Sequence, residues 1–180
     1  MSARYAMTVD TRRCVGCNAC VIACKTENRL PAGAFRDWIT TETRGVFPAL
    51  SQEIRSERCN HCAKAPCVRV CPTGASHVGA GGTVLVAPRK CTGCSACITA
   101  CPYDARSLHG PSGTADKCTF CGHRVQRGEP PACVAACPTR ALVFGDRADP
   151  ASEVARLLRE RRHKVNQPET GAEPNVFFLL

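Results

Sequence analysis

Aromatic side chains are scarce in this 180-residue chain, and long apolar runs are missing from it. Only 5% of the residues are aromatic, and Trp38 is the single tryptophan. No stretch approaches the roughly 20 apolar residues that a membrane-spanning helix needs. The N-terminal segment contains a twin-arginine pair, Arg12 and Arg13, but lacks the apolar core of a secretory signal. We therefore expect a thin hydrophobic core, no direct membrane span and no signal peptide of its own.

Patterns that mark a catalyst are also missing. The sequence has no Ser/His/Asp set, no glycine-rich phosphate loop and no dinucleotide-binding fingerprint. Its five histidines are scattered, and no cysteine group lacks a member that a histidine pair would have to replace. We therefore expect a protein that is not an enzyme by itself, with these histidines as non-ligands: His61, His77, His109, His123 and His163.

Cysteine, in contrast, is abundant. The chain contains 16 cysteines, which fall into four groups of four with none left over. Groups one and three have the spacing C-x₂-C-x₂-C-x₃-C, whereas the middle gap widens to four residues in group two and to eleven in group four. In chain order the groups are Cys14, Cys17, Cys20 and Cys24; Cys59, Cys62, Cys67 and Cys71; Cys91, Cys94, Cys97 and Cys101; and Cys118, Cys121, Cys133 and Cys137.

This spacing is typical of iron–sulfur proteins. The first three cysteines of a group wrap a loop around one cluster, and the fourth lies about one helical turn further on, where it reaches the other cluster of a pair. A proline follows the last cysteine in groups two, three and four, whereas Lys25 follows it in group one. The pattern predicts that all sixteen cysteines are metal ligands and that they hold four [4Fe–4S] clusters.

Three other interpretations compete with this one. A disulfide framework suits a secreted protein, which the missing signal and the strict repetition disfavour. Structural zinc uses C-x₂-C pairs but does not account for the third cysteine of each loop or for the Cys-Pro endings. One of the sites could hold another metal or a three-iron cluster. Because every group offers a full set of cysteines, four-iron clusters throughout are favoured.

The basic residues are accounted for by the same clusters. The formal net charge of +9 would ordinarily suggest nucleic acid as a partner. Four oxidised clusters on thiolates carry about −2 each, or about −8 together, which leaves a net charge of about +1. We therefore expect no nucleic-acid partner. A cation also precedes the first cysteine of each group, where it either favours thiolates and reduced clusters or is merely solvated: Arg13, Arg58, Lys90 and Lys117.

Hydrophobic patterning between the groups predicts an α+β fold. Residues 4–10 and 141–146 read as strands, and residues 18–28 read as the helix after the first loop. Residues 76–88 contain a glycine-rich turn between two apolar runs, which indicates a hairpin. Residues 149–162 predict a short surface helix. The last residues, VFFLL, would dock either on their own domain or on a partner subunit.

Several of these motifs resemble a known family. The chain is similar to the four-cluster iron–sulfur electron-transfer subunits of molybdopterin oxidoreductases in the dimethyl sulfoxide reductase superfamily. Within it, the chain resembles the polysulfide/thiosulfate reductase B subunits and their nitrite-reductase-associated relatives. The resemblance covers nearly the whole chain and rests on YAMTVDTRRCVGCNACVIACKTEN, CNHCAKAPCVRVCPTGA, CTGCSACITACPYDAR, DKCTFCGHRVQRGEPPACVAACPTRALVFGD and the PNVFFLL ending.

The resemblance implies two ferredoxin-like dicluster domains, one inserted in the other. Residues 1–50 plus 110–148 form the outer domain, residues 51–109 form the inserted one, and residues 149–180 provide a C-terminal helix and an extended tail for subunit contact. Carried over residue by residue, the ligands are Cys14, Cys17, Cys20 and Cys137 for cluster 1; Cys118, Cys121, Cys133 and Cys24 for cluster 2; Cys59, Cys62, Cys67 and Cys101 for cluster 3; and Cys91, Cys94, Cys97 and Cys71 for cluster 4.

The same resemblance implies an electron relay between two partners. One is a catalytic subunit with a molybdopterin (bis-MGD) cofactor, and the other is an integral membrane anchor that reacts with quinones. The complex would be a polysulfide/thiosulfate-type reductase, placed on the periplasmic face by co-export with a partner that carries a twin-arginine signal. A relay in a hydrogenase or formate-linked complex, or a free polyferredoxin carrier, remains the alternative. The apolar tail and the thin core favour a complexed subunit.

Overall fold

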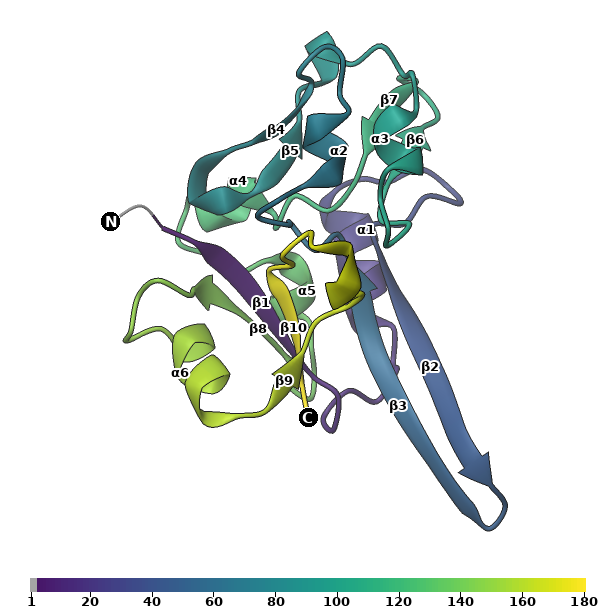
Figure 1. Ribbon diagram of the computed structural model, residues 1–180, viewed down its shortest axis with the longest axis vertical. Coiled ribbons are helices and arrows are strands. Elements are labelled where there is room, and N and C mark those ends of the chain that lie inside the picture. The colour runs from purple at the N-terminus through teal and green to yellow at the C-terminus, as the bar shows by residue number, and fades with distance from the viewer. Residues whose placement is uncertain (1–2) are drawn as a thin grey trace.

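A four-stranded sheet forms the centre of the molecule in the computed structural model, which describes residues 3–180. Its strand order is β8, β1, β10, β9 (Figure 1). The central strand β1 (Tyr5–Asp10) runs antiparallel to β8 (Leu142–Asp146) and parallel to β10 (Val176–Leu179). The short strand β9 (His163–Lys164) pairs with the far side of β10. The strands expected over residues 4–10 and 141–146 are thus confirmed as β1 and β8.

Strand β1 is buried on both faces, which its sequence did not predict. The alternation of residues 4–10 suggested one solvent-facing side. Instead, Met7 and Val9 face the main core, which contains many of the cysteines, and Ala6 packs against Val154 on the other side. Val154 belongs to α6 (Glu153–Glu160), which covers that face of the sheet. A chain-distant helix therefore buries the residues that local patterning would leave exposed.

The apolar tail is part of the same sheet. Strand β10 contains the segment VFFL, and Met7 of β1 lies opposite Val176 while Asp10 lies opposite Leu179. All four residues of β10 are buried. Of the two interpretations left open for the tail, docking on its own domain is the one that the structure supports. The tail therefore no longer argues for a covering partner, and the subunit-contact role of residues 149–180 stays a prediction.

The helices confirm the two that were expected. Helix α1 (Ala19–Glu27) follows the first cysteine loop, and α6 begins after Ser152, whose side chain accepts a hydrogen bond of 3.1 Å from the Ala155 N–H. Within residues 3–180, no helix is long and apolar enough to cross a bilayer. The other helices are single turns, namely α2 (Pro66–Arg69), α3 (Ala96–Thr99), α4 (Gly122–Val125), α5 (Ala132–Ala135) and the 3₁₀ turns at Ala80–Gly82, Pro88–Lys90 and Pro168–Thr170.

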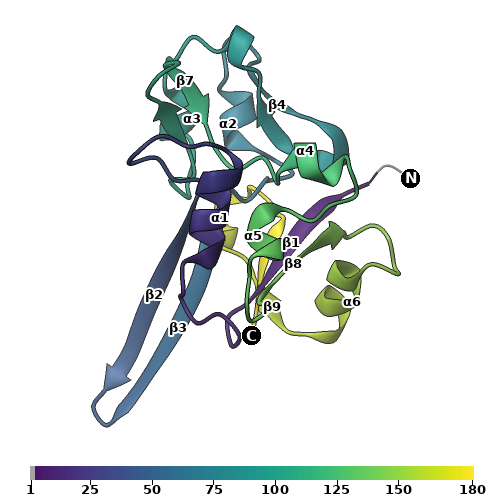
Figure 2. The ribbon, with the colours of Figure 1, turned by 180° about the vertical axis from the view of Figure 1, so that it is seen from behind.

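Two small hairpins complete the upper part of the molecule in Figure 1. The expected hairpin over residues 76–88 is confirmed as β4 (Ser76–Val78) and β5 (Val84–Val86). The second pairs β6 (Ser107–His109) with β7 (Thr114–Asp116). Both lie beside α2 and α3, above the four-stranded sheet. Seen from behind in Figure 2, α1 and α5 lie next to each other below α2 and α3.

A long hairpin that the sequence analysis did not anticipate projects from the body. It pairs β2 (Asp37–Val46) with β3 (Ala49–Arg58) and extends well beyond the sheet in both views (Figures 1 and 2). The hairpin runs across residue 50, where the resemblance divides the outer domain from the inserted one. The division into residues 1–50 plus 110–148 and 51–109 stays a prediction.

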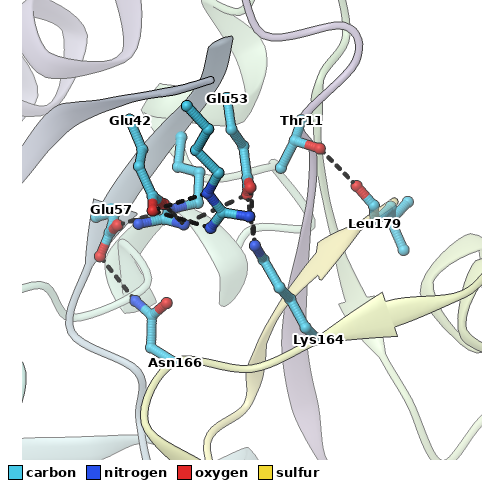
Figure 3. A network of polar contacts seen from close by, with 9 residues as sticks. Thr11, Glu42, Glu53, Glu57, Lys164, Asn166 and Leu179 are labelled. Atoms are coloured by element: carbon cyan, nitrogen blue, oxygen red, sulfur yellow. Dashed lines mark hydrogen bonds and ion pairs between the residues drawn. The ribbon is translucent and has the colours of Figure 1, made fainter. Parts of the chain in front are cut away.

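Polar contacts fix the hairpin to the edge of the sheet. Arg55 of β3 lies among carboxylates, with its Nε 3.1 Å from Oε1 of Glu57 and its Nη1 3.3 Å from Oε1 of Glu53. Lys164 of β9 pairs with Glu53 at 2.8 Å, and the Asn166 amide donates a 2.7 Å hydrogen bond to Glu57 (Figure 3). These contacts connect the C-terminal segment to β3 and so hold the hairpin in its orientation relative to the sheet.

The buried tail gives a direct test of the fold. Phe178→Ala removes a ring that is 1% exposed and should destabilise the protein by about 3–5 kcal/mol. For a chain of this size, that lowers the thermal midpoint by roughly 6–20 °C. The control is Phe47→Ala at the hairpin tip, where the ring is 83% exposed and should matter little. Anaerobic circular dichroism measures both midpoints, and equal shifts for the two variants would contradict a docked tail.

Candidate metal centres

Three cavities are each lined by four cysteines that come from two different groups. In every case one group supplies three sulfurs and another group supplies the fourth. The quartets are the ones that the resemblance implies for clusters 1, 2 and 4, and we call them quartets 1, 2 and 4: Cys14, Cys17, Cys20 and Cys137; Cys118, Cys121, Cys133 and Cys24; and Cys91, Cys94, Cys97 and Cys71.

The remaining four cysteines form quartet 3, and their electrostatic effects on one another indicate that they lie close together. Burial raises the pKa of Cys62 to about 12, and the neighbouring charges of Cys59, Cys67 and Cys101 raise it as well. Cys59 and Cys101 act on Cys67 in the same way. Quartet 3 therefore combines three cysteines of group two with one cysteine of group three, the same three-plus-one pattern as in the other quartets.

Short helices deliver one sulfur to each of two sites. Helix α1 carries Cys20 of quartet 1 and, one turn later, Cys24 of quartet 2. Its neighbour α5 begins near Cys133 of quartet 2 and ends just before Cys137 of quartet 1. Four residues make about one helical turn, so each of these segments presents one sulfur to each of two neighbouring sites. Helices α2 and α3 repeat the arrangement for quartets 3 and 4 with Cys67, Cys71, Cys97 and Cys101.

Left-handed backbone residues shape the two short cysteine loops. Gly16 and Asn18 have positive φ angles in the first loop, and Gly93 and Ser95 have them at the same positions in the third. A side chain at Gly93 would place its Cβ 2.5 Å from the carbonyl oxygen of Gly113. Glycine adopts this conformation without strain and leaves room for the neighbouring backbone. The loops can therefore curl tightly around their cavities.

The cavities suit a group larger than one ion. Thiolates stand about 2.3 Å from a single zinc ion. Across the described part of the chain, no three cysteine, histidine, aspartate or glutamate side chains gather tightly enough for one metal ion. Two buried donors beside the quartets, Nε of Arg58 and Nη1 of Arg106, have no hydrogen-bond partner among residues 3–180. Buried donors normally have acceptors, so these nitrogens fit an inorganic, sulfide-rich group next to the cysteines.

Burial makes bare thiolates unfavourable at the inner quartets. It raises the pKa of Cys133 to about 12 and that of Cys118 to about 11, although the charges of Lys117 and Arg58 act on Cys118 in the opposite direction. Isolated negative charges are costly in such an environment. Iron cations at the quartets would offset this cost, because a bound metal ion stabilises the thiolate form.

The four cations that precede the cysteine groups fall into two classes. Arg58 and Lys117 are only 2% and 3% exposed, whereas Arg13 and Lys90 are exposed to solvent. The sequence pattern made the four positions look equivalent. The structure separates two solvated charges from two that lie in the core next to cysteines.

Arg58 is the centre of a buried polar network between quartets 1 and 2. Its Nη1 donates to Sγ of Cys133 at 3.0 Å, and its Nη2 lies 3.1 Å from Oδ1 of Asp37. The Ser56 hydroxyl contacts both Asp37, at 3.0 Å, and Sγ of Cys20, at 3.2 Å. Sequence reasoning missed Asp37 and Ser56, because neither lies in a cysteine motif and only the hairpin β2–β3 brings them to the sites.

Exposure differs systematically among the quartets. Every cysteine of quartet 2 is buried, and in quartet 3 only Cys101 is partly accessible. Quartets 1 and 4 each contain one exposed cysteine, Cys17 and Cys94. The series therefore has a buried middle and two accessible ends.

His61 is fully buried, and its contacts are those of a core residue. Its ring stacks on Phe120 with centroids 3.7 Å apart, and its Nδ1 accepts a 3.1 Å hydrogen bond from the Val84 N–H. Burial lowers the pKa of His61, and the charges of Lys117, Arg106 and Arg58 lower it further. The imidazole is therefore neutral near pH 7.

Comparisons with known proteins agree with this arrangement. A family profile described as a 4Fe-4S dicluster domain matches residues 50–147, and a second with the same description matches residues 13–75. The tetrathionate reductase B subunit of Salmonella typhimurium is 46% identical over 98% of this chain and 72% of its own length. Protein NrfC of Escherichia coli is 45% identical over 97% of this chain and 79% of its length.

A further relative is matched over almost its whole length. The polysulfide reductase B subunit of Wolinella succinogenes is 40% identical over 99% of this chain and 95% of its own. The two dicluster matches and the sixteen cysteines give the chain four [4Fe–4S] clusters as its cofactors. The chain therefore belongs to the 4Fe-4S dicluster proteins, and among them to the iron–sulfur electron-transfer subunits of the dimethyl sulfoxide reductase superfamily.

Proposed function

We propose that the chain relays single electrons between a molybdopterin catalytic subunit and a quinone-reactive membrane anchor. The observation that carries this proposal is the order of exposure along the four quartets. Quartets 1 and 4 each reach the surface through one cysteine, Cys17 and Cys94, whereas quartets 2 and 3 lie between them in the core. Such an order suits a path that electrons enter at one end and leave at the other.

Each quartet holds one cluster in this proposal. Quartets 1, 2 and 4 are supported by the cavities that their four cysteines line, and quartet 3 by the mutual effects of its cysteines on their pKa values. Each cluster, when bound, takes up and releases one electron at a time. The chain itself fixes the sulfurs on short helices, excludes water from the two inner sites and places polar side chains such as Ser56 against them.

The chain's relatives suggest the type of complex. Two of them are named as subunits of tetrathionate reductase and polysulfide reductase. We propose that this chain serves a reductase of the same polysulfide/thiosulfate type. The choice of substrate would be made in the catalytic subunit. All cysteines of residues 3–180 are assigned to clusters in this proposal, so none is left to react with a substrate.

The partners would also place the protein in the cell. We propose attachment to the membrane through the quinone-reactive anchor, on the periplasmic face. Attachment would run through the anchor, because no helix within residues 3–180 is long and apolar enough to span a bilayer. The periplasmic side rests on the co-export that the family resemblance implies.

The crosswise assignment predicts a specific pattern of iron loss. Cys24→Ser and Cys118→Ser should each remove one cluster, so about four of roughly sixteen irons per chain. Because both ligands belong to quartet 2, the double variant should lose no more than either single variant. The control pair is Cys137→Ser with Cys118→Ser, which affects quartets 1 and 2 and should lose about eight. Iron analysis of anaerobically purified protein reads all of them, and additive losses for the first pair would contradict the crosswise assignment.

The relay proposal predicts a stable complex. A tagged chain expressed with its neighbouring genes should elute from a sizing column with a molybdenum-containing subunit and a membrane protein, in equal amounts. A monomer of 19.3 kDa that keeps its iron would instead identify a free polyferredoxin carrier. Detergent-solubilised membranes and soluble extract are compared, so that loss of the anchor is recognised.

The predicted side of the membrane can be tested separately. In intact spheroplasts, added protease should degrade the chain if it lies on the periplasmic face. A cytoplasmic marker protein in the same sample should stay intact. Full protection of the chain until the membrane is lysed would place it in the cytoplasm and contradict the predicted side.

A further inference from the structure

The three boundaries between successive quartets each contain one buried cation. These cations are Arg58, Lys117 and Arg106, and their residues are only 2%, 3% and 6% exposed. Sequence patterning pointed to two of them but not to Arg106, which follows group three in the segment CPYDAR. Cationic residues are rarely buried to this degree unless they are paired with negative charge.

Arg58 occupies the boundary between quartets 1 and 2. Its Nη1 donates a 3.0 Å hydrogen bond to Sγ of Cys133 in quartet 2. Its Nη2 contacts the Ser56 hydroxyl, which lies 3.2 Å from Sγ of Cys20 in quartet 1. One side chain therefore acts on both quartets of this pair.

Arg106 occupies the equivalent boundary between quartets 3 and 4. Its side chain lines the cavity of quartet 4, and its charge also acts on Cys67 and Cys59 in quartet 3. Its Nη2 donates a 2.8 Å hydrogen bond to Ser76, whose backbone N–H donates in turn to Sγ of Cys71 at 3.3 Å. Unlike Arg58, Arg106 makes no ion pair with a carboxylate among the described residues.

Lys117 lies where quartets 2 and 3 meet. It directly precedes Cys118 of quartet 2, and its ammonium group donates a hydrogen bond to the Cys118 carbonyl. Its charge also acts on His61, which lies next to Cys62 of quartet 3 in the sequence. The charge of Cys59 in quartet 3 also acts on Cys118 across this junction, and the ring of His61 stacks on that of Phe120 there, with centroids 3.7 Å apart.

We propose that Arg58, Lys117 and Arg106 are fixed counter-charges, one for each step of the relay, and that each raises the electron affinity of the two clusters beside it. The inference rests on the cluster assignment made above. An arriving electron adds negative charge to a cluster, and a buried cation close to it stabilises that charge strongly because little water screens it. A cation shared by two clusters also weakens the repulsion that a reduced cluster exerts on its neighbour.

The surface cations supply matched controls. Lys90 precedes Cys91 just as Lys117 precedes Cys118, but Lys90 is exposed and its charge is screened by water and salt. Arg58 is not used in the first test, because its removal would leave Asp37 buried without its ion-pair partner. Arg106 has no such carboxylate partner, so it can be changed with less damage to the fold.

The test compares Lys117→Gln with Lys90→Gln, and Arg106→Gln with Arg106→Lys. Anaerobic redox titrations followed by electron paramagnetic resonance measure how much of each cluster is reduced at a fixed potential. Each glutamine substitution of a buried cation should lower the reduced-to-oxidised ratio of two clusters by roughly ten-fold. Lys90→Gln should change it by less than about two-fold, and Arg106→Lys should stay close to the wild type. Without the shared cation, fewer molecules should hold both clusters reduced at the same time. The spin-coupled part of the paramagnetic resonance signal at partial reduction should therefore fall as well.

Iron and sulfide analysis distinguishes a failure of the counter-charge inference from a failure of the cluster assignment. If the wild type holds its clusters and the glutamine variants hold theirs but titrate like the wild type, the counter-charge inference is wrong and the relay stands. If the wild type lacks four clusters, the cluster assignment itself fails. If Lys117→Gln loses iron, the neutral variant Lys117→Met is titrated in its place. A lowered reduced-to-oxidised ratio for Lys117→Met beside an unchanged Lys90→Gln supports the inference, whereas equal profiles for the two variants overturn it.

Discussion

Sixteen cysteine sulfurs, most of them buried, in a small, aromatic-poor protein are the constraint on which the rest of the structure depends. Buried thiolates are costly without cations next to them, and burial raises the pKa of Cys118 and Cys133 accordingly. The inorganic clusters supply that positive charge and at the same time link distant segments of the chain. They take over much of the role that a larger hydrophobic core has in other domains.

Crosswise sharing of cysteines turns this constraint into a geometry. Because α1 and α5 each position sulfurs for two quartets, two neighbouring sites receive ligands that lie about one helical turn apart along the same segment. The same arrangement in α2 and α3 gives a second pair. The stacked rings of His61 and Phe120 join the two pairs, so four sites form one series with a buried middle. The central sheet and its docked C-terminal strand hold the first pair in place.

Sequence alone predicted the features that are encoded locally. The cysteine spacing identified the cofactor, and apolar patterning located β1, α1, β8 and the hairpin over residues 76–88. Features that depend on distant contacts were missed. The sequence around Arg58 and Lys117 does not distinguish them from the exposed Arg13 and Lys90, because their burial depends on segments that are distant in the sequence. The hairpin β2–β3 was overlooked since its long polar strands face solvent, and it brings Asp37 and Ser56 to the sites.

The central claim is that these sulfurs hold four cubane clusters. It is tested most directly by the iron and acid-labile sulfide content of the wild-type protein, purified without oxygen and quantified against amino-acid analysis. The account predicts about sixteen irons and about sixteen sulfides per chain, in a brown protein. A folded, colourless product that contains zinc or disulfides in place of iron would contradict it.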